Sequence, residues 1–141
     1  TPIYEGTNGI QSMDLVARKM MDGGAAAFAL MDDMEALASA SNSDLAKAVL
    51  AAIAQLRATT QWVVAQELNE RFAGSVAYQK AFARVLGGYF HLVASMSGQA
   101  KRQRLARVYI NSLLPEAASL CAQAQAGAAD LYALELDDFA A

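Results

Sequence analysis

The sequence contains only one cysteine, two prolines and nine glycines in 141 residues. Because Cys121 is the only cysteine, no intrachain disulfide can form, and a zinc site built on thiolates is disfavoured. So few prolines and glycines argue against an all-β chain, which needs a turn about every ten residues. The lack of disulfides favours a reducing compartment, so we expect a cytoplasmic protein.

Charged residues are also scarce, at 18% of the chain, whereas 55% of the residues are hydrophobic. The net charge of −3 lacks the positive excess of a nucleic-acid-binding protein, so no nucleic acid is expected as a partner. No run of 18 apolar residues is free of charge, and we therefore expect no integral membrane segment. The chain begins Thr1-Pro2 and shows no charged-then-apolar leader. We therefore expect no signal peptide and interpret the chain as an excised piece or a processed product.

Alanine and other apolar residues at helical spacing are abundant instead. After a loop over residues 1–6, the spacing predicts helices over about 8–22, 25–40, 45–72, 76–96 and 101–134. The expected boundaries are Gly23-Gly24, a loop over 39–44 with Ser43 as N-cap, Gly74-Ser75 and Ser97-Gly98. Pro115 lies inside the last stretch, where we expect a kink or a restart with Pro115 at the first helical position. Residues 135–141 are expected to form an acidic, fraying tail.

The third stretch keeps one apolar stripe in phase from Leu45 to Phe72 without a break. No segment alternates with period two, and no internal repeat is evident. Short loops between consecutive helices favour antiparallel neighbours. The sequence therefore predicts an all-α fold, an up-and-down antiparallel bundle of four main helices plus an N-terminal helix.

The residues that carry chemistry lie at the N-terminus, where residues 3–11 read Ile-Tyr-Glu-Gly-Thr-Asn-Gly-Ile-Gln, with Arg18 two turns later. This stretch resembles the Tyr-Glu-Gly-Thr signature near the end of the catalytic part of flavin-dependent acyl-CoA dehydrogenases. From Gly23 onward the chain is similar, more loosely, to the extra C-terminal helical domain of some bacterial members. The similarity there includes Lys101, Ala106, Tyr109 and the Leu113-Leu114-Pro115 segment. The resemblance thus divides the chain into residues 1–22, the end of the catalytic region, and residues 23–141, a helical bundle domain.

The resemblance implies an enzyme that removes a proton and a hydride from the α and β carbons of an acyl-CoA thioester, with FAD as hydride acceptor. Such an enzyme needs a base, and a carboxylate serves when an apolar pocket raises its pKa. Glu5 is the one acid in the motif and, by resemblance, is the α-proton base. Tyr4 and Gly6 would bind the substrate beside it.

The same resemblance assigns the next three residues to the cofactor. Thr7 and Asn8 open a helix whose free backbone N–H groups suit flavin phosphate or ribose. Relatives often have glutamine where this chain has Gly9, so Gly9 would contribute only its backbone. No metal ligand is expected.

Other candidates have plainer interpretations. His91 is the only histidine, and it is expected to be a packed helix residue rather than a base or ligand. Asp32, Asp33 and Glu35 are expected to form a solvated face rather than a metal site or acid pair. A basic cluster is expected to be a solvated helix start, with a CoA phosphate site or an anionic membrane contact as alternatives. The cluster consists of Lys101, Arg102, Arg104 and Arg107.

Two functional hypotheses remain. In the leading one, the chain is part of an FAD-dependent acyl-CoA dehydrogenase of fatty acid metabolism. The resemblance then implies an acyl-CoA substrate, a homo-oligomer and an electron-transfer flavoprotein as partner. Without the upstream residues, this chain is expected to bind no flavin and to be inactive. The alternative is a non-catalytic helical module for oligomerisation or partner docking, with the motif only marking the junction.

Overall fold

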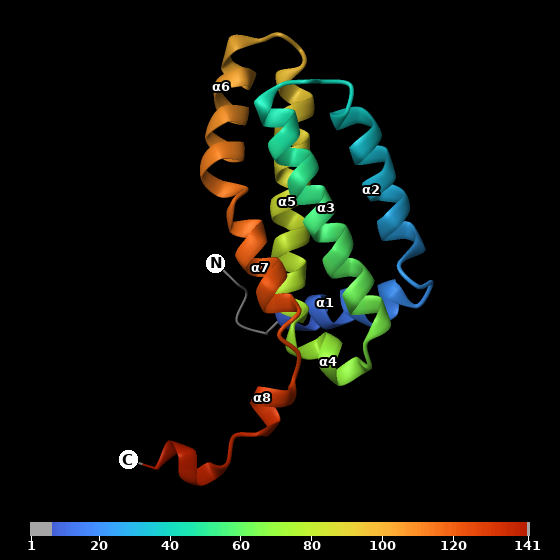
Figure 1. Cartoon of the computed structure of the whole chain (residues 1–141), viewed down its shortest axis with the longest axis vertical. Coiled ribbons are helices and arrows are strands. Elements are labelled where there is room, and N and C mark those ends of the chain that lie inside the picture. Colours follow the sequence, from blue (N-terminus) through green and yellow to red (C-terminus); the bar gives the residue numbers. More distant parts are fainter. Residues whose placement is uncertain (1–6, 141) are drawn as a thin grey trace.

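The computed structural model describes residues 7–140, which contain helices and no strand. Four helical columns stand side by side and alternate in direction along the long axis (Figure 1). They are α2 (Ala25–Ala38), α3 (Asp44–Ala65), α5 (Ser75–Ser95), and α6 (Ala100–Val108) continued by α7 (Glu116–Ala124). The predicted all-α fold class is therefore confirmed.

Shorter elements lie at one end of this bundle. α1 (Thr7–Val16) crosses that end and leads through a 3-10 turn, η1 (Arg18–Met20), into α2. α4 (Leu68–Ala73) lies beside α1 at the same end, between α3 and α5. Gly23 and Gly24 join η1 to α2 with φ of 70° and 81°, a conformation that side chains other than glycine rarely adopt. The predicted helix boundary at these two glycines is confirmed.

The core lies between α5 and the helices around it. Its largest fully buried side chains include Met31 and Met34 of α2, Ile53 and Leu56 of α3, and Tyr78 of α5. Full burial of such a side chain stabilises the fold by about 1.5–3 kcal/mol. The sequence also places the start of α3 correctly, because the Ala46 N–H donates to the Ser43 hydroxyl at 3.1 Å. Ser43 is therefore the N-cap that the sequence predicts.

The uninterrupted helix predicted from Leu45 to Phe72 is wrong. The helix ends at Ala65, the backbone is extended at Gln66 and Glu67, and α4 begins at Leu68. The side chain of Arg71 turns back and donates to the carbonyls of Val64 at 2.9 Å and Gln66 at 2.7 Å. These carbonyls at the end of α3 would otherwise lack partners, so Arg71 stabilises the break.

The last predicted helix, 101–134, is divided at two places. Before Pro115 the chain widens into a π-turn, η2 (Tyr109–Leu113), in which the Leu114 N–H donates to the Tyr109 carbonyl at 2.9 Å. The wider turn accommodates a proline that cannot donate, and α7 restarts at Glu116, directly after Pro115, as predicted to within one residue. The prediction that the helix continues to residue 134 is wrong, because α7 ends at Ala124.

One helix of the described chain, α3, is long and apolar enough to cross a membrane by length and composition alone. The core helix of a helical bundle passes the same test, and α3 contributes buried residues along its whole length. It also carries Asp44, Lys47 and Arg57. The absence of an integral membrane segment thus stays a prediction from the sequence.

Candidate functional site

Three of the six predicted site residues, Tyr4, Glu5 and Gly6, lie outside the described residues. The other three form the first turn of α1, where Thr7 and Gly9 are half-buried and Asn8 is exposed. A side-chain carbon added at Gly9 would meet no atom within 4 Å. The first-turn N–H groups of a helix have no partner within it, so this turn is open to an acceptor from outside.

The middle of α1 is attached to the bundle through a buried pair of hydroxyl groups. Ser12 is fully buried; its hydroxyl donates to the Gly9 carbonyl at 2.8 Å and lies 3.2 Å from the Ser75 hydroxyl. Ser75 opens α5 and is itself buried. Since the Ser12 proton points to Gly9, Ser75 is the donor within the pair. This pair ties the motif helix to the central helix of the bundle.

The other end of α1 is held by Arg71 of α4. In addition to its two bonds at the end of α3, the Arg71 guanidinium donates to the Val16 carbonyl at 3.2 Å. One side chain thus joins the ends of α1 and α3. With Ser12 anchored on Ser75, α1 is fixed against the bundle in its middle and at its C-terminal end.

A groove of about 700 Å³ does not include the described predicted site residues Thr7, Asn8 and Gly9. It lies between η1 and the α3–α4 junction, at the C-terminal end of α1. Thr7 is at the opposite end of this ten-residue helix, about 15 Å away at 1.5 Å per residue. Arg18 in the groove is already paired with Asp14 at 2.6 Å, and this guanidinium lowers the pKa of the Asp14 carboxyl. Among the residues of the resemblance, the groove thus includes Arg18 but none of Thr7, Asn8 and Gly9.

Two buried ionisable groups have structural roles. The Tyr78 hydroxyl lies 2.8 Å from that of Thr60, and burial raises the pKa of Tyr78 to about 12. Cys121 is 4% exposed, and burial also raises the pKa of its thiol. Both groups stay protonated near neutral pH, so neither is poised as a base or nucleophile. Cys121 is therefore a small buried hydrophobic residue.

His91 is likewise a packed helix residue, as predicted. It is half-buried on α5, and its ring stacks on Tyr109 with centroids 4.6 Å apart and planes inclined by 26°. Over residues 7–140, no group of three histidine, cysteine, aspartate or glutamate side chains is arranged to hold a metal ion.

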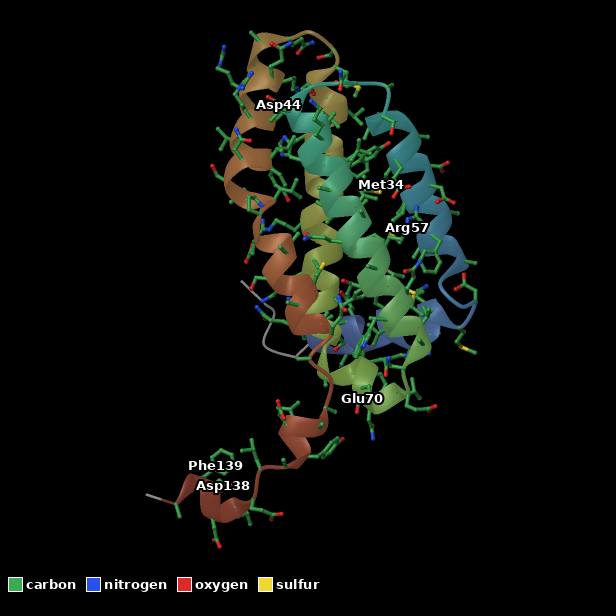
Figure 2. The ribbon with its side chains drawn as sticks, viewed as in Figure 1. Met34, Asp44, Arg57, Glu70, Asp138 and Phe139 are labelled. Atoms are coloured by element: carbon green, nitrogen blue, oxygen red, sulfur yellow. The ribbon has the colours of Figure 1, made fainter. Side chains whose placement is uncertain are left out.

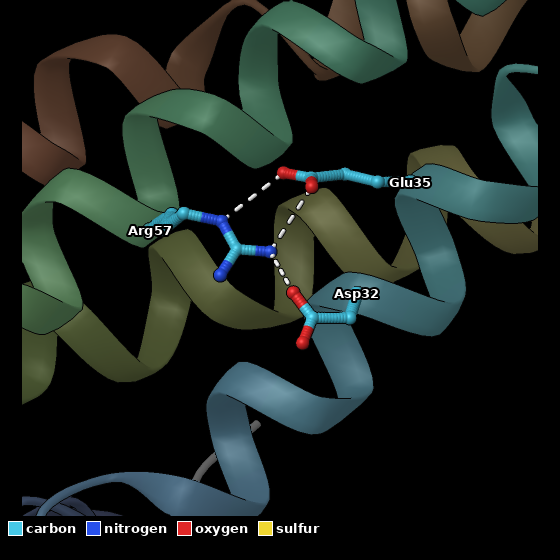
Figure 3. Close-up of polar contacts among 3 residues, drawn as sticks. All are labelled: Asp32, Glu35 and Arg57. Atoms are coloured by element: carbon cyan, nitrogen blue, oxygen red, sulfur yellow. Dashed lines mark hydrogen bonds and ion pairs between the residues drawn. The ribbon is translucent and has the colours of Figure 1, made fainter.

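The acidic residues of α2 are only partly the solvated face that the sequence predicts. Asp32 and Asp33 are exposed, but Glu35 is half-buried and binds Arg57 of α3 (Figure 3). Arg57 donates to Glu35 at 3.2 and 3.1 Å and to Asp32 at 2.6 Å. The hydrogen bond to Glu35 and, to a smaller extent, the hydrogen bond to Asp32 raise the pKa of Arg57. The Arg57 guanidinium also lies over the ring of Phe28, 5.9 Å from its centroid. The cluster joins two helices through these contacts, so we interpret it as structural.

Substituting Arg57 with alanine is expected to lower the free energy of unfolding by about 0.5–1 kcal/mol, because partly exposed ion pairs contribute little. The matched control is Lys47→Ala, which removes an exposed pair with Asp44 whose atoms are 3.6 Å apart. This control is expected to have no measurable effect. Urea unfolding at low and high salt measures both variants, and the loss at Arg57 should shrink at high salt. Equal stability of the two variants would show that the Arg57 cluster contributes nothing.

The basic cluster lies at the start of α6, at the end of the bundle opposite α1 (Figure 1). All four of its side chains, Lys101, Arg102, Arg104 and Arg107, are exposed, and none forms an ion pair with another described residue. The predicted solvated helix start is confirmed by this exposure.

Together these elements define an all-α bundle with a helical junction, α1, fixed across one end. Residues 25–135 match the family model described as "Acetyl-CoA dehydrogenase C-terminal like", and the chain belongs to this family. The match begins at the first residue of α2, and it confirms the predicted relationship to the C-terminal helical domain of acyl-CoA dehydrogenases. Comparison with curated proteins and with solved structures finds no match.

Proposed function

We propose that this chain is the C-terminal part of a flavin-dependent acyl-CoA dehydrogenase that carries out α,β-dehydrogenation of an acyl-CoA thioester. The observation that carries this proposal is the order of two features along one chain. The Tyr4-Glu5-Gly6-Thr7 signature is followed within 20 residues by a helical domain of the matching family. Either feature alone would be weaker evidence for this function, because helical bundles serve many functions and short motifs occur by chance.

Glu5 is the proposed base that takes the α proton, and Tyr4 and Gly6 are the proposed substrate contacts. The α proton is acidified by the thioester carbonyl, so a single carboxylate held close to it suffices as acceptor. The geometry of α1 supports a positioning role for the bundle. Glu5 lies two residues before α1 in the sequence, and α1 is anchored through Ser12 to Ser75 and through Val16 to Arg71. The bundle thus fixes the helix that directly follows the proposed catalytic residues.

When bound, FAD supplies the acceptor for the β hydride. The residues present fit a contact with it: the first turn of α1 is open, its N–H groups are free within the helix, and Gly9 has no side chain in the way. We assign this contact to Thr7, Asn8 and the backbone of Gly9. Three residues are a small part of a flavin site, so the 141-residue chain is expected to be colourless and inactive by itself. By the same resemblance, we propose a homo-oligomeric, cytoplasmic parent that passes electrons to an electron-transfer flavoprotein.

The proposal predicts that the full-length protein containing this chain has a flavin that acyl-CoA reduces. Under anaerobic conditions, acyl-CoA thioesters of increasing chain length should bleach the visible flavin absorbance, with one length most effective. The matching free fatty acids lack the thioester that acidifies the α proton and should leave the flavin oxidised. A bound flavin that no acyl-CoA reduces would rule out the proposed reaction.

The second candidate function is the docking module, and a different observation favours it. The C-terminal residues leave the bundle with their apolar side chains exposed, and the basic residues of α6 have no partner in the described chain. Both hypotheses can hold, because the motif and the bundle occupy different parts of the chain.

A further inference from the structure

The last twelve described residues, 129–140, form an arm that leaves the bundle. It contains α8 (Ala129–Tyr132) and a 3-10 turn, η3 (Leu136–Phe139), and all of its residues are exposed. Figures 1 and 2 show it extending beyond the end of the bundle, with Asp138 and Phe139 far from the helices. Its exposed apolar side chains are Leu131, Tyr132, Leu134, Leu136 and Phe139. A group of apolar side chains this exposed is unusual on a monomer and typical of a surface that another molecule covers.

The base of the arm is fixed to the bundle. The Glu70 carboxylate of α4 accepts a hydrogen bond from the Ala128 N–H at 2.8 Å, and Ala128 is 2% exposed. Gly127 before it has φ of 75°, and a side-chain carbon there would lie 2.5 Å from the Glu70 carboxylate. Because only glycine fits this turn, the direction in which the arm leaves is set by the fold.

Charge is strongly separated between the arm and the helices before it. Residues 116–141 contain no lysine or arginine, and the arm carries Asp130, Glu135, Asp137 and Asp138. Residues 71–115 contain no acid and seven of the eleven basic residues, including the basic cluster of α6. The arm and α6 are therefore complementary in charge, which favours association between them.

α6 also offers an apolar surface among its charges. Leu105 is 42% exposed and Val108 is 62% exposed. These two residues share a helix face with Lys101 and Arg104, because residues three and four apart are neighbours on a helix. The face therefore combines basic and apolar side chains, as the arm combines acidic and apolar ones.

In the structure the arm lies far from α6 of its own molecule (Figure 1). The arm leaves from the end that carries α1 and α4, whereas α6 begins at the opposite end (Figure 1). The 22-residue helix α3 alone separates these ends by about 33 Å. The arm points away from the bundle. In two copies packed with their long axes antiparallel, however, each arm lies near α6 of the other copy, so both contacts form at once.

We propose that the arm docks on α6 of a second copy of this chain, with its acids facing Lys101 and Arg104 and its apolar side chains against Leu105 and Val108. An anionic membrane would satisfy the basic residues but would repel the acidic arm and leave its apolar side chains uncovered. A second copy covers both surfaces. This inference deepens the docking hypothesis above, and it does not depend on the dehydrogenase reaction, because its test requires no flavin or substrate.

A charge-swap experiment on the 141-residue chain tests the contact by sedimentation equilibrium. One variant reverses the arm with Asp130→Lys and Asp137→Lys, which spares the Glu135–Asp138 capping box of η3. The other reverses the charge of the helix with Lys101→Glu and Arg104→Glu, and an acid at position 101, in the first turn of α6, is favourable for the helix dipole. The unaltered chain should dimerise, more weakly at high salt. Each variant alone should associate roughly tenfold or more weakly, and an equal mixture should recover a heterodimer because both contacts again pair opposite charges.

The control variant is Asp33→Lys with Glu67→Lys. It changes the net charge by the same amount as the arm variant, but at exposed acids outside the arm. It should dimerise like the unaltered chain. A further variant, Leu136→Ser with Phe139→Ser, should weaken association without any change of charge. Circular dichroism verifies that each variant is folded. The proposal is overturned if the unaltered chain stays monomeric, if the mixture does not recover the dimer, or if a monomeric chain binds phosphatidylserine vesicles through α6 instead.

Discussion

Turnover by the proposed full-length dehydrogenase is expected to fall about a hundredfold to ten-thousandfold when Glu5 is replaced by glutamine, the range that general-base catalysis contributes. Glutamine keeps the size and polarity of glutamate but cannot accept the α proton. The flavin should stay bound, because the proposed contacts to it come from the first turn of α1. Turnover is measured with an artificial electron acceptor, and the flavin content from its visible absorbance.

The matched control is Asp14→Asn, which also neutralises one acid close to the motif. Asp14 lies on α1 and pairs with the exposed side chain of Arg18, so this change should leave turnover within a factor of about two of the unaltered enzyme. Turnover retained by the Glu5→Gln variant would contradict the assignment of Glu5 as the base. A loss of flavin together with turnover would instead place Glu5 in the cofactor site.

Gly74→Ala is expected to lower the free energy of unfolding by about 3 kcal/mol, the upper part of the range for overpacking a core. Gly74 lies between α4 and α5, where its backbone meets the end of α7. A side-chain carbon at Gly74 would lie 2.1 Å from the carbonyl oxygen of Ala124 and 2.8 Å from its carbonyl carbon. The atoms it meets are backbone, so no rotamer change relieves the contact and α7 must move away from α5. With φ of −96°, Gly74 itself has a conformation that alanine accepts, so the whole effect comes from the close approach.

Gly9→Ala provides the control for this prediction. Gly9 lies in the first turn of α1, and an added carbon there would meet nothing within 4 Å. Alanine favours a helix over glycine by up to about 1 kcal/mol, so this variant should be as stable as the unaltered chain or slightly more so. Urea unfolding followed by circular dichroism measures both variants. Equal stability of the two would contradict the close packing of α5 against α7.

The sequence predicts those parts of the fold that depend on local interactions. The Ser43 N-cap and the Gly23-Gly24 boundary both follow from residues within one or two turns. The break at residues 66–67 is not predicted, because the apolar stripe continues through it. Arg71 stabilises this break through the carbonyls of Val64 and Gln66, and it also binds Val16, 55 residues away in sequence. A periodic pattern records neither the bonds of an arginine to the backbone nor a partner that distant.

The burial and the partners of side chains also depend on how the helices pack, which the local sequence does not specify. A single helix is predicted over residues 8–22, but within that range Val16 and Met20 are buried whereas Ile10 is 67% exposed. The burial follows from where α1 crosses the bundle, which the spacing does not specify. The Arg57 cluster depends likewise on α2 packing against α3.

The candidate site was predicted from a resemblance of a few consecutive residues. Of those residues, only Thr7, Asn8 and Gly9 are described, and they lie in an open helical turn as a flavin contact requires. The role of Glu5 stays a prediction. The contact of Ser12 with Ser75 has no signal in the sequence, whereas the separation of charge between the arm and α6 could have been read from it directly.

The double anchoring of α1 has a thermodynamic consequence. A ligand at the first turn of α1, such as the proposed flavin, binds the folded chain, in which α5 and Arg71 hold α1 in place. Binding at this turn and folding of the bundle are therefore linked equilibria, and the stabilisation by a ligand grows as RT ln(1 + [L]/Kd). In the proposed dehydrogenase, bound flavin would therefore raise the melting temperature of the whole bundle.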